Sequence, residues 1–223
     1  MKKFATAAPV SAVLDIPAGR IRFIAADRDD ATVEVLPADA SKSRDVKAAA
    51  QTGVSFGDGV LRIEAPAAGN QYFGQSGAVE VTVRLPAGSR VDVKAAAAEL
   101  RGVGRLGDVT FESAQATVKL DETASARVSL QAGDITVGRL GGDAEIRTRK
   151  GDLRIDEARR GTVVLSTEAG RIDVGAARGV SASLDAGTAY GRVGNSLRNT
   201  EGAGAGLVIS ATTSYGDITA RSL

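Results

Sequence analysis

Five short stretches decide the fold of this chain: AGDITV at 132–137, KGDLRI at 150–155, AGRIDV at 169–174, YGRV at 190–193 and YGDITA at 215–220. Each contains a glycine followed by a polar residue and then an aliphatic residue. The aliphatic residue two places after the glycine is never missing: it is Ile135, Leu153, Ile172, Val193 and Ile218. Apolar residues also recur five and seven places before every one of these glycines. A pattern that aligns at positions not used to find it indicates an internal repeat.

The same frame extends upstream, where Ala116 and Ala98 stand in place of the glycine. The turn positions are then residues 98, 116, 133, 151, 170, 191 and 216, and consecutive ones lie 17 to 25 residues apart. Apolar and polar residues alternate on both sides of each turn, which indicates strands and excludes helices. A period near 20 residues is typical of a solenoid, whose coils bury their apolar faces by stacking. Residues 89–223 are therefore predicted to form a parallel β-solenoid, β-helix-like, of about seven coils.

The polar positions fit the same register. Stacked coils would place Arg171 beside Asp152 and Asp173 beside Arg154, giving two ladders of opposite charge. Threonine recurs three places before the turn in four coils, at Thr148, Thr167, Thr188 and Thr213. Such a hydroxyl ladder could match ice or a repetitive glycan. We favour the structural alternative, in which the hydroxyls satisfy one another and the backbone at a corner of the solenoid.

The first 88 residues show no such period. Alternating segments bounded by turn residues predict strands at 12–16, 20–25, 31–36, 53–56, 60–65 and 79–85. Gly57-Asp58-Gly59 between two of these segments is typical of a hairpin. Residues 41–51 are predicted to form the one helix, with Asp39 and Ser41 as candidate N-caps. Residues 1–88 should thus form an antiparallel β cap that covers the first coil and is continuous with the solenoid.

The composition excludes several classes of function. The 223 residues include no histidine and no cysteine, so Ser-His-Asp triads, cysteine nucleophiles and Cys/His zinc sites cannot be built. With 28 basic and 27 acidic residues the net charge is +1, which argues against binding to nucleic acid or an anionic membrane. No apolar stretch is long enough for a membrane helix, and polar residues interrupt the N-terminal run that a secretion signal would need. The expected location is the cytoplasm.

The order of segments points to a family. LDIPAGRIRFIAADRDDATVEV at 14–35, VEVTVRLPAGSRVDV at 79–93 and the repeated GDI, GDL and GRI coils are followed by SYGDITARSL at 214–223. This arrangement resembles the bacterial "putative adhesin" β-strand-repeat family of unknown function, especially its actinobacterial members. The resemblance covers essentially the whole chain and implies a β-strand-repeat architecture. Because that family has no established catalytic motif, the resemblance implies no catalytic residue.

Three carboxylates are candidates for chemistry on such a scaffold. Asp134, Asp152 and Asp217 each follow a turn glycine, where carboxylates on a solenoid face could hold calcium or act as acid and base. We favour a structural interpretation, in which each carboxylate accepts hydrogen bonds from nearby backbone N–H groups. Arg171 and Arg192 occupy the same column and argue against a shared calcium array. No metal ion and no cofactor are expected.

Four aromatic residues are candidates for ligand contact. Tyr190 and Tyr215 precede the turn glycine in the last two coils and should lie one above the other, as a platform for a sugar ring or an aromatic ligand. Tyr72 and Phe73 lie together in the loop 68–77. The alternative is that these side chains pack against the loop 195–206.

The predicted function is therefore a non-enzymatic scaffold or protein-interaction module. The chain ends three residues after Ala220, so the last coil should be uncovered, and a homo-oligomer would cover its strand edges. The alternative is a small-ligand or glycan-binding protein that uses Tyr190, Tyr215 and the loop 68–77. A β-helical lyase that relies on aspartate and arginine ranks third, and catalysis by Asp152 is what it would require.

Overall fold

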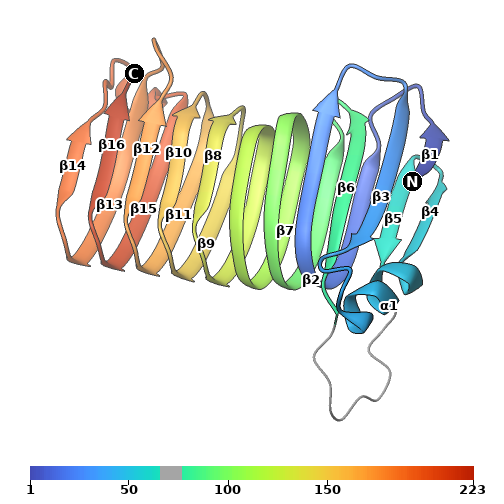
Figure 1. The fold of residues 1–223 in the computed structure, drawn as a ribbon. Coiled ribbons are helices and arrows are strands. Elements are labelled where there is room, and N and C mark those ends of the chain that lie inside the picture. Colours follow the sequence, from blue (N-terminus) through green and yellow to red (C-terminus); the bar gives the residue numbers. More distant parts are fainter. Residues whose placement is uncertain (66–76) are drawn as a thin grey trace.

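The computed structural model describes residues 1–65 and 77–223, which are mostly strand (Figure 1). The α-helix is α1 (Ser43–Gln51), and a 3-10 helix, η1 (Gly202–Gly204), precedes the last two strands. The strands of the N-terminal part are β1 (Lys2–Ala5), β2 (Ser11–Ala26), β3 (Asp30–Pro37), β4 (Gly53–Gly57), β5 (Val60–Glu64) and β6 (Val79–Pro86). The later strands are β7 (Arg90–Ala132), β8 (Ile135–Leu140), β9 (Ala144–Lys150), β10 (Leu153–Ala158), β11 (Gly161–Ala169), β12 (Ile172–Ala176), β13 (Ala182–Tyr190), β14 (Val193–Ser196), β15 (Leu207–Tyr215) and β16 (Ile218–Ser222).

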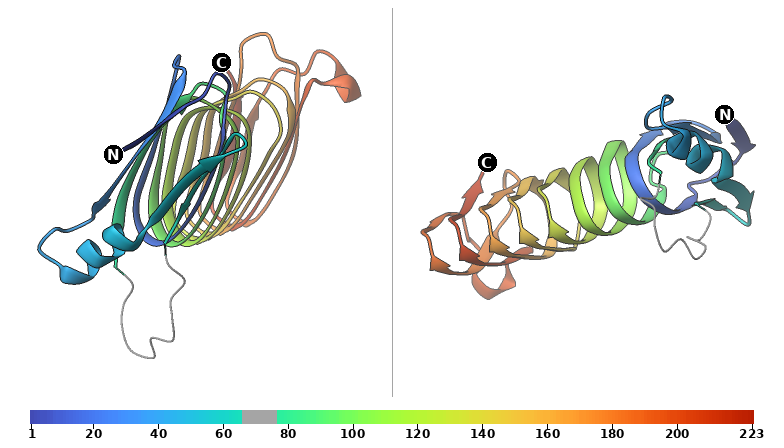
Figure 2. Two further views of the ribbon diagram at one scale, coloured as in Figure 1. Left: turned by 90° about the vertical axis from the view of Figure 1, so that its right-hand side faces the viewer. Right: turned by 60° about the horizontal axis from the view of Figure 1, so that its bottom comes forward.

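The strands from β7 onward wind into stacked coils, which we call rungs. Among the described residues, every pairing between strands β7 to β16 is parallel. Leu153 lies beside Ile135 on one side and Ile172 on the other, and each of the three is 1% exposed. The predicted solenoid-like arrangement, with aliphatic columns that share one interior, is confirmed. Figure 2 shows the rungs following one another along a single axis.

The glycines of the repeat are required by the close approach of one corner to the next. At Ala98 and Ala116, β7 runs through the corner without a break, whereas strands end at the glycine corners from Gly133 onward. Gly151 has φ 146°, and a Cβ atom there would lie 2.1 Å from the carbonyl oxygen of Gly133. The corner at Gly133 is as tight, with 1.6 Å between such a Cβ atom and the carbonyl oxygen of Ala116. A side chain at either glycine would need both a strained backbone and a displaced neighbour.

Parallel pairing begins earlier in the chain than the sequence indicated. Strand β2 pairs in parallel with β7, and Gly19 lies beside Ala98 in the corner column. Strands β5 and β6 both pair in parallel with β2 on its other side. Residues 11–26 therefore form a rung, although the predicted antiparallel cap included them. The periodic pattern does not reveal this rung, because residues 27–89, with the helix, separate it from the next one.

Within residues 1–65 and 77–223, antiparallel pairing is confined to the outer strands of the N-terminal end. Strand β3 pairs with β6 and with β1, while β4 pairs with β5. The predicted hairpin is confirmed, since Asp58 and Gly59 at its turn have φ values of 51° and 74°. The fold is thus mostly β and largely parallel, with antiparallel strands near the N-terminus.

Helix α1 lies close to its predicted range, but its expected N-caps do not cap it. The N-cap residue is Lys42, without a side-chain hydrogen bond to the helix. Asp39 instead closes the turn before the helix, because its carboxylate accepts hydrogen bonds from the Ser41 hydroxyl at 2.7 Å and the Ser41 backbone N–H at 3.0 Å. The hydroxyl is the main reason that the pKa of Asp39 falls to about 2. Asp39 therefore forms an Asx-turn before the helix and does not cap it.

The order of the last rungs differs from their order in the sequence. Strand β15 pairs with β11 on one side and β13 on the other, and β16 lies between β12 and β14 in the same way. Residues 207–222 are thus inserted between residues 161–176 and 182–196, and β14 lies at the end of the stack in Figure 1. The expectation that the final residues form the uncovered coil is wrong. The uncovered rung is 182–196, which we call the terminal rung.

Candidate functional site

The aspartates after the turn glycines connect neighbouring rungs. Each carboxylate accepts a backbone N–H of the next rung at 2.8 Å: Asp134 from Asp152, Asp152 from Arg171 and Asp217 from Arg192. The structural interpretation of this column is confirmed, although the partners belong to the next rung and not to the same turn. These hydrogen bonds also explain how Asp134 and Asp152 are tolerated as neighbours of like charge.

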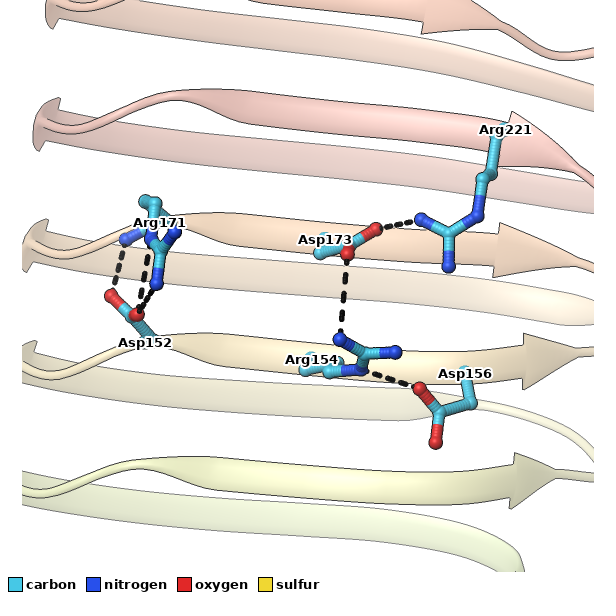
Figure 3. Close-up of polar contacts among 6 residues, drawn as sticks. All are labelled: Asp152, Arg154, Asp156, Arg171, Asp173 and Arg221. Carbon is cyan, nitrogen blue, oxygen red and sulfur yellow. Dashed lines mark hydrogen bonds and ion pairs between the residues drawn. The ribbon is translucent and has the colours of Figure 1, made fainter.

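The predicted charge ladder of Asp152 and Arg171 is present at this corner. The Arg171 guanidinium Nη2 lies 2.9 Å from Asp152 Oδ2, in addition to the backbone contact (Figure 3). The hydrogen bond from the Arg171 backbone N–H is the largest cause that lowers the pKa of Asp152, and the guanidinium adds to it. Both side chains are substantially exposed, so the pair mainly fixes the register of the rungs.

The second predicted ladder is also present and is part of a longer chain of charges. Arg154 Nη1 lies 3.9 Å from Asp173 Oδ2, and Arg154 Nε also contacts Asp156 at 2.5 Å. Arg221 contacts Asp173 from the following rung (Figure 3). Opposite charges thus alternate along this face. A shallow groove of about 490 Å³ lies over it, and both acidic and basic side chains line that groove.

The threonine ladder faces the interior. Thr148, Thr167 and Thr213 are each at most 6% exposed. The hydroxyl of Thr167 donates to the carbonyl oxygen of Gly151 at 3.1 Å, and that of Thr213 donates to Gly170 at 3.1 Å. Thr188 likewise donates to the carbonyl oxygen of Gly216 at 3.0 Å, whereas Thr148 donates to Lys150 of its own rung at 3.3 Å. The hydroxyls therefore satisfy backbone carbonyls at the corner, which agrees with the backbone part of the structural alternative, and they do not form a surface for ice or glycan.

The two C-terminal tyrosines form an exposed stack. Tyr190 and Tyr215 are register partners on β13 and β15, with ring centroids 4.9 Å apart and an interplanar angle of 5°. Their exposed fractions are 68% and 60%. The predicted vertical arrangement of the two rings is confirmed, and most of their surface is open to solvent.

The other aromatic predictions have different outcomes. Tyr72 and Phe73 lie outside the described residues. The loop that follows β14 does not account for the tyrosine stack, because it is tied to the opposite end of the strands. Its Thr200 and Glu201 backbone N–H groups both donate to the Ser181 hydroxyl at 3.1 Å, whereas Tyr190 lies at the far end of β13.

Exposed apolar side chains gather at the terminal rung and its neighbour. In the described part of the chain, the large hydrophobic residues with the greatest exposure are Met1, Leu36, Val46, Tyr190, Val193, Val208, Tyr215 and Leu223. Five of these eight lie within residues 182–223, and none lies between residues 47 and 189. The repeat pattern indicates the tyrosines as candidate contacts but gives no sign that Val193 and Val208 are exposed. The repeat pattern places Val193 in the buried column of Ile218, and only the rung order shows that no further rung of the described residues covers it.

Residues 1–65 and 77–223 contain no group of three or more acidic side chains placed to hold a metal ion. The same residues include no helix that is long and apolar enough to cross a membrane.

The fold places this chain in the class of β-rich proteins that are built from stacked, mostly parallel coils. The chain belongs to the Toastrack DUF4097 family, whose model matches residues 13–222. This confirms the resemblance to the adhesin-like repeat family, while the comparisons give no support to an actinobacterial type. No curated protein matches the sequence.

Three solved bacterial proteins are similar in structure. A putative adhesin from Bacteroides fragilis is 14% identical with a TM-score of 0.48, and the match covers 100% of this chain and 95% of the other. A putative adhesin from Parabacteroides distasonis is 15% identical with a TM-score of 0.41 and the same coverage. A putative cell adhesion protein from Clostridium sporogenes is 13% identical with a TM-score of 0.36, and the match covers 100% and 98%. At these values the similarities carry no argument about function.

Proposed function

We propose that this protein is a non-enzymatic scaffold that associates through the terminal rung, with a second copy of the same chain as its partner. The observation that carries the proposal is the gathering of exposed apolar side chains at residues 182–223. The middle of the stack presents ion pairs instead. A concentration of exposed apolar side chains in the last two rungs, on a protein whose middle is charged, favours an interaction site there.

The terminal rung also has free strand edges. In the described residues, β13 pairs only with β15, and β14 pairs only with β16. The backbone N–H and C=O groups on the outer side of both strands can therefore accept another strand. Pairing there would extend the sheet and cover the inward side chains of the rung.

A two-fold axis through the end of the stack offers a consistent geometry. Antiparallel pairing of two β13 strands centred on Ala186 keeps inward residues inward, because opposite residues share a face. Leu184 would then lie opposite Thr188, and Asp185 opposite Gly187, so no two carboxylates face each other. The aliphatic interior would continue from one copy into the next.

Analytical ultracentrifugation over a wide concentration range tests this proposal. We expect a monomer–dimer equilibrium that Val193→Asp shifts strongly to the monomer, because the charge would be buried in the interface. Val193 is 45% exposed in the single chain, so the variant should fold, which circular dichroism would verify. The matched control is Leu36→Asp, which places the same charge on a 47% exposed residue at the other end. A strictly monomeric wild type, or a Val193→Asp variant that dimerises like the wild type, would overturn the proposal.

A second candidate function is supported by the tyrosine stack. Two parallel rings that are mostly exposed, at 68% and 60%, offer a face on which a sugar ring or an aromatic ligand can stack. We therefore propose a small-ligand or glycan-binding role for Tyr190 and Tyr215.

The cytoplasmic location stays a prediction, and fractionation of the native cells would test it.

A further inference from the structure

The outer face of the last three rungs has an unusual composition. Twelve side-chain positions point outward from β11, β15 and β13, and we call them the hydroxyl face: Thr162, Val164, Ser166, Glu168, Val208, Ser210, Thr212, Ser214, Ser183, Asp185, Gly187 and Ala189. Six of the twelve carry hydroxyl groups and two carry charges. None of the twelve is buried.

Most of the same outward positions in the three preceding rungs are charged. They are Asp108, Thr110, Glu112, Ala114, Ser125, Arg127, Ser129, Gln131, Asp143, Glu145, Arg147 and Arg149, of which seven are ionic. Some of these charges pair across rungs, as between Arg127 and Glu145 at 3.5 Å. A repeat that alternates inward and outward residues needs polar outward positions, but it does not need uncharged ones. The change from charged to hydroxyl side chains is therefore local to the last three rungs.

The hydroxyl groups on this face are available to a ligand. Ser166 and Thr212 share one weak hydrogen bond at 3.4 Å. Within residues 1–65 and 77–223, the hydroxyls of Thr162, Ser210 and Ser214 have no hydrogen-bond partner in the protein. Each can both donate and accept, which is the capacity that recognition of another hydroxyl requires.

The tyrosine stack lies at the end of the same strands. Tyr215 on β15 and Tyr190 on β13 continue the alternation of the inward residues, but they lie at the corner where both strands end and are therefore exposed. The strands thus present hydroxyls and small apolar groups along their length and exposed aromatic rings at their end. A sugar has both complementary features, because its ring carries hydroxyls around the edge and apolar C–H groups on its faces.

We infer that the hydroxyl face and the tyrosine stack together bind an extended, neutral carbohydrate chain. This inference rests on the second candidate function and gives it a ligand class. The surface is nearly flat because most of its side chains are small. A linear oligosaccharide could therefore lie along the sheet. Sugar hydroxyls bond to the serine and threonine hydroxyls, and one sugar ring stacks on an exposed tyrosine ring.

The charges favour a neutral chain over an acidic one. The face carries two carboxylates, of which Glu168 lies 3.8 Å from Arg149 and Asp185 has no ion pair among the described residues. An acidic polysaccharide would meet Asp185 without compensation. A protein partner is less well matched, because the valines Val164 and Val208 are the large aliphatic side chains on the face and interface centres are usually richer in apolar and aromatic groups.

Tyrosine fluorescence offers a direct measurement, because the chain has three tyrosines and no tryptophan. In a Tyr72→Phe background, emission reports on Tyr190 and Tyr215 alone. We would titrate this protein with cellohexaose, maltohexaose and xylohexaose, with polygalacturonate as the acidic probe, and repeat each titration by calorimetry. We expect a neutral oligosaccharide to change the emission and to bind with a dissociation constant of about 1 mM or tighter.

Two variants distinguish this site from other surfaces. Tyr215→Ala should weaken binding about tenfold, and Thr212→Arg should weaken it similarly by placing a long charged side chain on the hydroxyl face. Leu36→Ala and Val193→Asp are control variants that should bind oligosaccharide like the wild type. Because Val193→Asp should lose self-association only, the failure of one proposal can be distinguished from the failure of the other. The inference is overturned if no neutral probe binds up to about 10 mM. It is also overturned if polygalacturonate binds more tightly than every neutral probe, or if both site variants bind normally.

Discussion

The two ends of the stack differ in how their outer strand edges are covered. At the N-terminal end, the outermost rung is formed by β5 and β6, and the antiparallel strands β4 and β3 cover its edges. Leu61 in that rung is fully buried beneath this cover. At the other end, Leu184 occupies the same inward column in the terminal rung but is only partly buried. A covered edge and an uncovered edge thus give one residue type, in one column, two different environments.

The composition of the terminal rung partly reduces the apolar area that its uncovered side exposes. Asn195 stands beside Ala220 in an inward column that holds Val137, Ile155 and Val174 in earlier rungs. Its side-chain oxygen accepts the backbone N–H of Leu197 at 3.0 Å. Polar inward residues reduce the apolar area that an uncovered rung exposes, which is what terminal repeats of a solenoid require. Leu184 and Val193 are apolar exceptions in this rung, and the test of the self-association proposal uses the exposure of Val193.

The largest expected difference between a covered rung and the terminal rung comes from the corner glycines. Gly151→Ala should cost at least about 3 kcal/mol of the unfolding free energy, because its φ of 146° and its neighbour at 2.1 Å both resist a side chain. Gly191→Ala meets the carbonyl oxygen of Gly216 at 2.0 Å, but its rung can move outward, so we expect less than half that cost. Urea unfolding of the two variants measures both values. Equal losses would show that the terminal rung is held as rigidly as the middle.

A leucine at each end gives the next comparison. Leu61→Ala should cost about 2–5 kcal/mol, because it leaves a cavity between β4 and the rung beneath it. Leu184→Ala should cost about 1 kcal/mol, since the side chain is partly solvated before truncation. Urea unfolding at neutral pH measures both. A larger loss for Leu184 would show that a partner covers the terminal rung under the conditions of the measurement.

The smallest expected effect concerns pH and the Asp152 corner, which the terminal rung lacks because Arg192 occupies that column. The pKa of Asp152 is lowered in the folded protein, so its stabilising contribution is present above about pH 4 and is lost as pH falls through the folded-state pKa. Asp152→Asn should therefore lose less stability than the wild type on acidification below pH 4, by less than about 1 kcal/mol given its exposure. Thermal unfolding at a series of pH values measures this. Identical acid losses in the two proteins would contradict the assignment.

Much of the fold could be predicted because its signals are local. Alternation at period two assigned Leu153 and Ile172 to one interior column, and the corner glycines set the register that placed Arg171 beside Asp152. The same register predicted the stacked rings of Tyr190 and Tyr215. These features need only strand geometry and the spacing of neighbouring rungs.

Other features of the candidate site could not be predicted in this way. The rung formed by residues 11–26 is separated from its partner by the helix and by β3 to β6, so no constant period reveals it. The exposure of Val193 depends on which rung lies beyond it, and its inward alternation is the same in either order. The hydroxyl face becomes one surface only because β15 lies between β11 and β13.

By itself, the sequence determined the strands, the inward and outward columns and the chemistry of each corner, because these follow from alternation and from the space that a tight turn leaves. Only the tertiary structure decided the order of the rungs at the two ends, and with it which edges are covered. Rungs with the same local pattern fit equally well on several neighbours, so long-range pairing and the return of the chain through residues 197–206 select among them.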